Sequence, residues 1–153
     1  MENFDIKQHT TPNKLEHYSF IWSEVRLVIA AIALFLGGYP VIFFVLPISP
    51  LYGLLTILLK LAWIISGAAS GYLLYRWAIG TKTVFGGKDS RDTTAFFISV
   101  VSGINLGITG LLGTNIGMSI SSSKLIFILV GILYLLAAVH LFRRWNSSGR
   151  KII

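Results

Sequence analysis

Four long runs of apolar residues, separated by short polar connections, dominate the chain. A helix needs about 20 mostly apolar residues to cross roughly 30 Å of hydrocarbon, and each run is close to this length. The pattern therefore predicts an all-α integral membrane protein, a bundle of four helices. The expected spans are residues 27–47, 51–75, 94–118 and 125–142.

The chain divides into three expected parts around these runs. Residues 1–26 form an N-terminal arm, residues 27–142 form the four-span membrane domain, and residues 143–153 form a basic tail. In the arm, Thr11 and Pro12 are typical of a helix start, and apolar residues then recur at helical spacing. We expect an amphipathic segment that lies in the membrane interface. The alternative is a plain helical extension of the first span.

Glycine and proline interrupt the first span. Residues 37–40 read Gly-Gly-Tyr-Pro. Proline removes a backbone hydrogen bond and glycine loosens a helix, so we expect a kink near the middle of the membrane. Pro47 and Pro50 then end the span and predict a tight hairpin into the second span.

The composition supports a membrane location. Hydrophobic residues make up 54% of the 153-residue chain and charged residues 12%, whereas soluble domains carry about 25% charged residues. The chain has no cysteine, which excludes disulfides and thiolate metal sites.

The basic residues predict the orientation in the membrane. Most of the 13 Lys and Arg residues lie before the first span, between the second and third spans, or after the fourth. By the positive-inside rule, both termini are expected in the cytoplasm, in a plasma (inner) membrane. The net charge of +7 would then attract anionic headgroups on the cytoplasmic face. Because the charges flank the spans and form no single patch, we expect no nucleic-acid binding.

Small residues line one face of the third span and recur in the second. Gly103 and Gly107 form a GxxxG pair, and Gly67 and Gly71 form another. Helices in lipid associate through close backbone approach at such faces, so we expect these two spans to pack tightly. The rival interpretation is that a glycine face serves a partner chain. The expected packing residues are Gly67, Gly71, Gly103, Gly107, Gly110 and Gly117.

Lys60 is a cation inside the apolar second span, on the same predicted helix face as Gly67. We therefore expect its side chain to point into the bundle. At a rise of about 1.5 Å per residue, several polar residues of the other spans fall at a similar depth. The candidate binding residues are Lys60, Asn105, Tyr39, Thr109 and Tyr134.

Three interpretations of Lys60 stay open. Its flexible stem can reach the outer headgroups, in which case the residue only snorkels. It can be neutralised by burial together with hydrogen bonds. It can also hold an anionic group, such as a lipid phosphate or an anionic substrate. The expected spans contain no Asp or Glu, which argues against a proton-coupled pump.

The sequence contains no recognisable catalytic or metal-binding pattern. His9 and His17 lie in the arm, and His140 lies near the end of the fourth span beside arginines. The expected spans hold no HExxH motif and no pair of carboxylates, and their serines have no adjacent base. We therefore expect no enzyme activity, no cofactor and no metal.

Two functional hypotheses follow. The first is a non-catalytic membrane protein, a packing or assembly subunit that associates with copies of itself or with another membrane protein. The second is a small oligomeric transporter, flippase or channel, in which Lys60 holds an anionic substrate or a lipid phosphate with Asn105 and Tyr39. The glycine faces favour the first hypothesis, and the polar layer favours the second.

Overall fold

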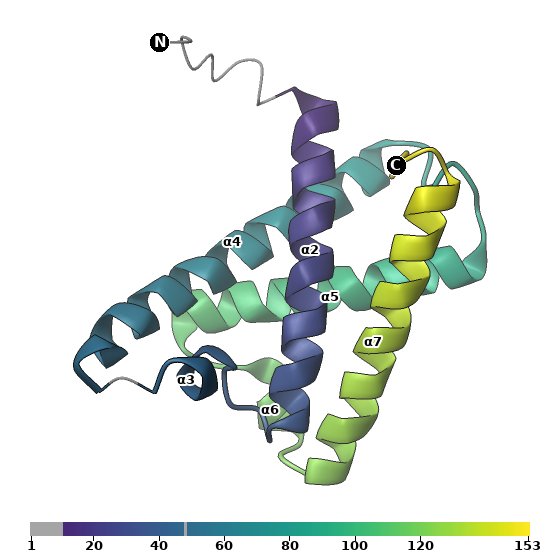
Figure 1. The fold of residues 1–153 in the computed structure, drawn as a ribbon. Helices are drawn as coiled ribbons and strands as arrows, with labels where there is room; N and C mark the ends of the chain where they lie inside the picture. Colours follow the sequence, from purple (N-terminus) through teal and green to yellow (C-terminus); the bar gives the residue numbers. More distant parts are fainter. Residues whose placement is uncertain (1–10, 48) are drawn as a thin grey trace, which may run out of the picture.

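Helices dominate the computed structural model, which describes residues 11–47 and 49–153 (Figure 1). The four long helices are each long and apolar enough to cross a membrane, so the expectation of an all-helical fold with four long apolar helices is confirmed. The long helices are α2 (Pro12–Phe35), α4 (Tyr52–Ile79), α5 (Ser90–Leu112) and α7 (Lys124–Ser147), and the short ones are α3 (Ile42–Val45), η1 (Ser49–Leu51) and α6 (Ile116–Ile120).

α2 begins at Pro12, so most of the expected arm belongs to the first long helix. Proline is favoured in a first helical turn because its missing N–H needs no partner there. Phe20 and Leu27 lie on the side of α2 that is buried against the other helices. Residues 12–26 of the arm are therefore packed into the bundle as part of α2, and a position of the arm in the membrane interface stays a prediction. Residues 1–10, which include His9, lie outside the described residues.

The end of α2 corrects the expected kink. The helix ends at Phe35, short of the expected end of the span at residue 47. Gly37 and Gly38 have φ values of 81° and 86°, in the left-handed region that glycine enters without steric cost. The N–H of Gly38 donates to the carbonyl oxygen of Ala33 at 2.8 Å, which closes the helix end. The glycines therefore terminate the helix instead of bending it.

α5 also ends earlier than the expected span. Leu112 is its last residue, and Gly113 caps it with a φ of 74°. The side-chain carbonyl oxygen of Asn115 then accepts from the N–H of Met118 at 3.2 Å and caps the start of α6. Gly117 consequently lies in α6 and not on the glycine face of α5.

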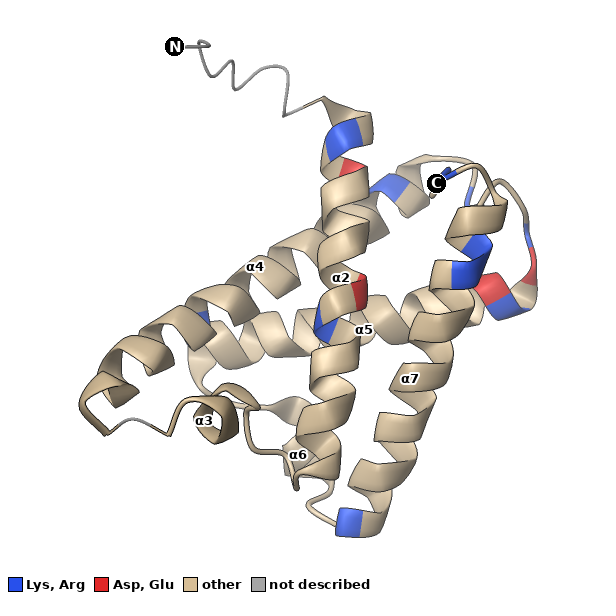
Figure 2. Ribbon diagram, in the orientation of Figure 1, with Lys and Arg blue, Asp and Glu red and all other residues tan. Residues whose placement is uncertain are grey.

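The long helices alternate in direction along the chain. The start of α2, the end of α4, the start of α5 and the end of α7 gather at one end of the molecule (Figure 1). This end is termed the charged end, because it carries ion pairs of Glu16 with Arg76 and of Asp92 with Arg144 (Figure 2). α4 and α5 run obliquely past α2 and α7 and make the most extensive helix contact with each other.

The C-terminal residues fasten the charged end. Ile152 is buried, and its carbonyl oxygen accepts from the N–H of Phe85 at 2.7 Å. The N–H of Ile153 donates to the Glu16 carboxylate at 2.9 Å. The ring of Phe20 on α2 lies 5.9 Å from that of Phe85, centroid to centroid. The tail thereby ties the α4–α5 connection to α2.

Glycines bring the backbones of α4 and α5 into direct contact. A Cβ atom added to Gly67 would lie 2.6 Å from Cα of Gly107, and one added to Gly107 would lie 2.6 Å from Cα of Gly67. Gly103 and Gly110 also face atoms of α4, whereas Gly71 has no such neighbour within 4 Å. Close approach of this kind is how helices gain packing energy in lipid.

We predict that Gly107→Ala destabilises the fold by about 1–3 kcal/mol, the usual cost of overpacking, because the new methyl group meets backbone that cannot rotate away. Gly71→Ala is the matched control in the other helix and should change stability by no more than about 0.5 kcal/mol. Thermal unfolding in detergent micelles measures both. Equal melting temperatures for the two variants would show that the backbone contact does not hold the helices together.

Candidate functional site

The polar layer expected around Lys60 is not assembled. The Lys60 side chain is exposed on α4, so the expectation that it points into the bundle is wrong. The reason lies in the helix contact itself. At Gly110 of α5, the nearest group of α4 is the backbone carbonyl of Lys60. Backbone therefore occupies the contact, and the long side chain projects away from it.

The other expected binding residues serve the ends of helices or the protein surface. The Asn105 carboxamide donates to Oδ1 of Asn115 at 2.9 Å and accepts from a backbone N–H at the start of α6 at 3.0 Å. The Thr109 hydroxyl donates to the carbonyl oxygen of Asn105 at 2.8 Å. Tyr39 is 66% exposed, and Tyr134 packs against the buried core. The structure thus joins Asn105 with Thr109 and makes no polar contact between Lys60 and them.

Arg26 is a buried cation that joins α2 to α5. Only 6% of the Arg26 surface is exposed. One terminal nitrogen donates to Oγ of Ser102 at 2.9 Å, and the other donates to the carbonyl oxygen and hydroxyl of Ser99 at 2.7 and 3.2 Å. Nε of Arg26 is buried without a hydrogen-bond partner among the described residues, but both terminal nitrogens are hydrogen-bonded, which lowers the cost of burying the charge. Arg26 therefore fastens the two helices through neutral acceptors.

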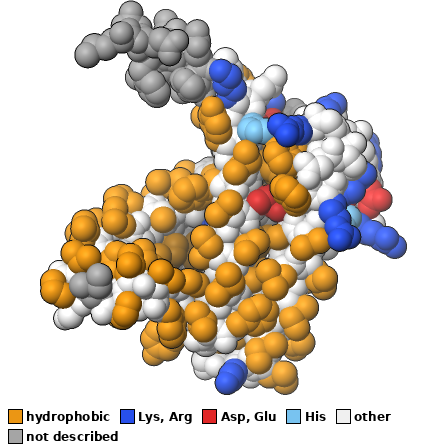
Figure 3. All heavy atoms as spheres, viewed as in Figure 1, with side chains coloured by type: hydrophobic (Ala, Val, Ile, Leu, Met, Phe, Trp, Pro, Cys, Tyr) orange, Lys and Arg blue, Asp and Glu red, His pale blue; other side chains and the backbone are white. Residues whose placement is uncertain are grey.

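Glu24 lies in an apolar groove between α2 and α7. The groove encloses about 570 Å³ between residues 20–28 and residues 135–145, and Figure 3 shows acidic atoms recessed among apolar side chains between these helices. Glu24 is 9% exposed, and neither carboxylate oxygen has a hydrogen-bond partner among the described residues. Every other lining side chain except that of Arg143 is apolar or aromatic.

The geometry of α2 keeps Glu24 and Arg26 apart. Residues two positions apart on an α-helix point about 200° from each other around the axis, since each residue advances about 100°. Arg26 consequently faces the serines of α5, and Glu24 faces α7. No ion pair links the two side chains, although they are near neighbours in the sequence. Arg26 has hydrogen-bond partners inside the bundle, and Glu24 has none among the described residues.

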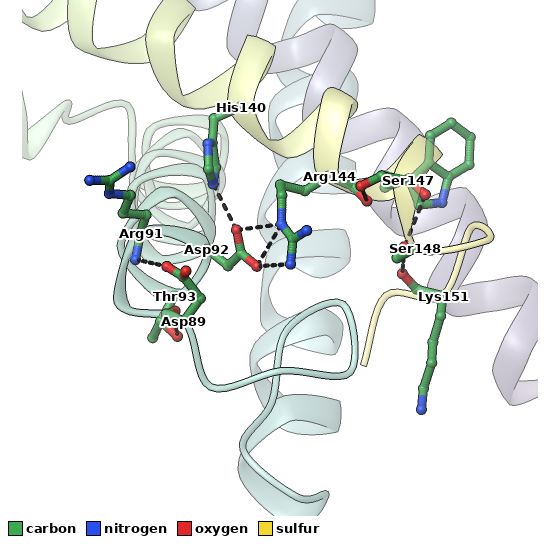
Figure 4. Close-up of polar contacts among 10 residues, drawn as sticks. Asp89, Arg91, Asp92, Thr93, His140, Arg144, Ser147, Ser148 and Lys151 are labelled. Carbon is green, nitrogen blue, oxygen red and sulfur yellow. Dashed lines mark hydrogen bonds and ion pairs between the residues drawn. The ribbon is translucent and has the colours of Figure 1, made fainter.

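Asp92 contacts two basic side chains at the charged end. It lies in the first turn of α5 and is 1% exposed. The Arg144 guanidinium of α7 donates to both carboxylate oxygens at 2.8–3.0 Å, and Nε2 of His140 lies 2.7 Å from one of them (Figure 4). Such a two-point arginine contact is directional. It fixes the end of α7 against the start of α5.

Two further polar contacts join α2 to α4. The Glu16 carboxylate pairs with the Arg76 guanidinium at 3.0 Å. Deeper in the bundle, the indole N–H of Trp22 donates to Oγ of Ser66 at 3.0 Å, and that hydroxyl donates to the carbonyl oxygen of Ala62 at 2.7 Å. Polar side chains of α2 thus contact α4 at two levels.

The polar groups described above form hydrogen bonds and ion pairs between the helices. Within the described ranges, no three His, Asp or Glu side chains are placed to hold a metal ion. The Ser66 hydroxyl is engaged by an indole and a carbonyl group, and neither can act as a general base for a nucleophile. The unusual feature is instead the uncompensated Glu24 carboxylate in its apolar groove.

Glu24 and Arg26 were missed as site residues because the first span was placed after them. Charged residues commonly flank spans, so both residues fall in the expected arm, which ends at residue 26. The signal that identifies Glu24 is helical spacing. Glu24 belongs to a series of residues that recur three or four positions apart, with Phe20, Ser23, Leu27 and Ala31. A helix face of this kind is buried, so the Glu24 carboxylate on that face is buried as well.

Four helices that are long and apolar enough to span a membrane are the hallmark of a multi-pass membrane protein. Comparison with protein-family models, with curated proteins and with solved structures finds no match for this chain.

We predict that Asp92→Asn lowers the melting temperature in detergent micelles, because the neutral carboxamide no longer compensates Arg144 and His140. Asp89→Asn is the matched control. Asp89 caps α5 by accepting from the N–H of Arg91 at 2.7 Å, and asparagine caps helices about as well as aspartate. A melting temperature that falls equally in both variants, or in neither, would contradict the role given to the Asp92 cluster.

Proposed function

We propose that this protein is a non-catalytic assembly subunit of a membrane complex, and that it contacts its partner through the α4 surface around Lys60. The observation that carries the proposal is the exposure of this cation within an apolar helix. The neighbouring Ile57, Leu58 and Leu61 are exposed as well. In a membrane this surface would place an ammonium group among acyl chains.

The energetics of lipid favour a protein partner at this position. Charged residues within spanning helices are costly and face other protein groups or water-filled cavities in most cases. α4 is also the least buried of the four long helices, so much of its surface is free to contact another chain. A partner with an acidic side chain in one of its own spans would compensate Lys60.

The partner that fits is a different membrane protein. The acidic residues of the four long helices are Glu16, Glu24 and Asp92. Glu16 is paired with Arg76, Asp92 is paired with Arg144, and Glu24 lies in the groove between α2 and α7. Within the part of the chain that the structure describes, the long helices of a second copy therefore offer no exposed, unpaired acidic side chain that would meet Lys60.

The transport hypothesis loses the arrangement that motivated it. A site for an anionic substrate needs several polar groups that converge on Lys60, and Asn105 is engaged with Asn115 instead. The proposed subunit has its charged end on the cytoplasmic side of a plasma (inner) membrane, where basic residues face anionic headgroups. It works without cofactor or metal.

A photo-crosslinking residue in place of Leu61, next to Lys60, tests the proposal in native membranes. We expect a hetero-adduct whose crosslink maps to a partner span that carries Asp or Glu. Lys60→Leu should reduce the adduct at least several-fold, and Lys60→Arg, which keeps the charge, should retain it. The same photo-crosslinker in place of Leu129, which is exposed on α7, is the matched control.

Two results would overturn the proposal. One is an adduct that Lys60→Leu leaves at the wild-type level. The other is the recovery of uncrosslinked monomer alone from Leu61, with the protein expressed and inserted normally. Either would leave Lys60 as a residue that snorkels to the headgroups.

A further inference from the structure

We propose that the α2–α7 groove binds one phospholipid whose head group carries a primary ammonium and a phosphate, as an ethanolamine head group does. The ammonium group donates to the Glu24 carboxylate, the phosphate accepts from Arg143, and an acyl chain follows the apolar wall of the groove. This lipid site is independent of the partner surface on α4.

The first support is the state of the Glu24 carboxylate. More than nine-tenths of the residue is buried, it lines the groove, and both oxygens lack a partner among the described residues. An unpartnered carboxylate in an apolar site is costly. A primary ammonium brings three donors and a positive charge, and charge-assisted hydrogen bonds are the strong ones.

The second support is the shape and lining of the groove. Its volume of about 570 Å³ lies within the usual range of small-molecule sites, about 300–1,000 Å³. Phe20 and Trp145 line it nearest the charged end, and Val28 and Leu135 line it toward the opposite end. A lipid can therefore place its head group near the charged end and its chain along the bundle, as it would in the surrounding bilayer.

The third support is Arg143, because its positive charge distinguishes a simple amine from an amine that is joined to a phosphate. This residue lines the same groove and is exposed. Its guanidinium would repel a simple alkylamine, whereas it matches the geometry of a phosphate. A choline head group has the phosphate but no N–H donor for Glu24. The combination of one acidic and one basic side chain with an apolar wall thus fits a zwitterionic head group with a primary amine.

Lipid-binding measurements on the purified full-length chain in detergent test the site. Phosphatidylethanolamine and phosphatidylcholine with identical acyl chains are titrated and scored by native mass spectrometry. We expect the wild type to bind the ethanolamine lipid at least about tenfold more tightly, since one charged hydrogen bond is worth that much. Glu24→Gln and Arg143→Gln should each remove most of this preference. Asp89→Asn and Lys124→Gln, which change charges outside the groove, should keep it.

A stability measurement separates a binding role from a structural one and covers the case in which Glu24→Gln binds poorly because it is misfolded. Glu24→Leu should raise the melting temperature of the lipid-free protein, because an apolar side chain replaces an uncompensated charge. It should also abolish the extra stabilisation that the ethanolamine lipid gives over the choline lipid. Val139→Trp, which fills the groove from its exposed wall, should weaken binding of both lipids.

The inference is overturned if the wild type binds the two lipids equally. It is also overturned if Glu24→Gln retains the wild-type preference, or if Glu24→Leu lowers the melting temperature of the lipid-free protein. The last result would mean that the carboxylate holds the helices together.

Discussion

A polar side chain inside an apolar bundle must find its partner within the protein, because hydrocarbon offers none. The fold meets this requirement at most of its buried charges. Arg26 is bonded to the serines of α5, and Asp92 is paired with Arg144. The hydroxyl groups of Ser23 and Ser70, the indole N–H of Trp77 and Nε of Arg26 are also buried without partners. The first three groups are neutral and cost less than a charge, and the Arg26 guanidinium is hydrogen-bonded through both of its terminal nitrogens. Glu24 and Lys60 are the charges left over, and each lies on a surface that another molecule could cover.

The same requirement explains how the helices are arranged. Two kinds of contact hold α2, α4 and α5 together. The backbones of α4 and α5 touch at their glycines, and polar side chains of α2 form hydrogen bonds with both of those helices. α7 is held to α5 at the charged end by Asp92, and beyond that by apolar packing. Between α2 and α7, no polar contact fills the space around Glu24, and this is where the groove lies.

The fold was largely predictable from the sequence, and the candidate site was not. Long apolar runs predict the helices directly, because the length of a membrane-spanning helix is set by the thickness of the hydrocarbon. Helix ends depend instead on local backbone conformation, so the sequence predicts a kink at Gly37 and Gly38, whereas their positive φ values end α2. The orientation of Lys60 depends on which atoms occupy the α4–α5 contact, and a helical wheel cannot distinguish a backbone carbonyl from a side chain. Glu24 is absent from the predicted site because the expected first span begins at residue 27, although the helix that begins at Pro12 carries Glu24 on its buried face.

Ionisable groups without a partner in the fold, Glu24 and Lys60, should mark the surfaces where other molecules bind. An experimental structure of the protein extracted together with its native lipids and neighbours tests this claim most directly. We predict a lipid amine within hydrogen-bond distance of the Glu24 carboxylate and an acidic side chain of another protein beside the Lys60 ammonium group. A structure in which Glu24 stays buried without a neighbour, and Lys60 extends to the headgroup region alone, would contradict the account.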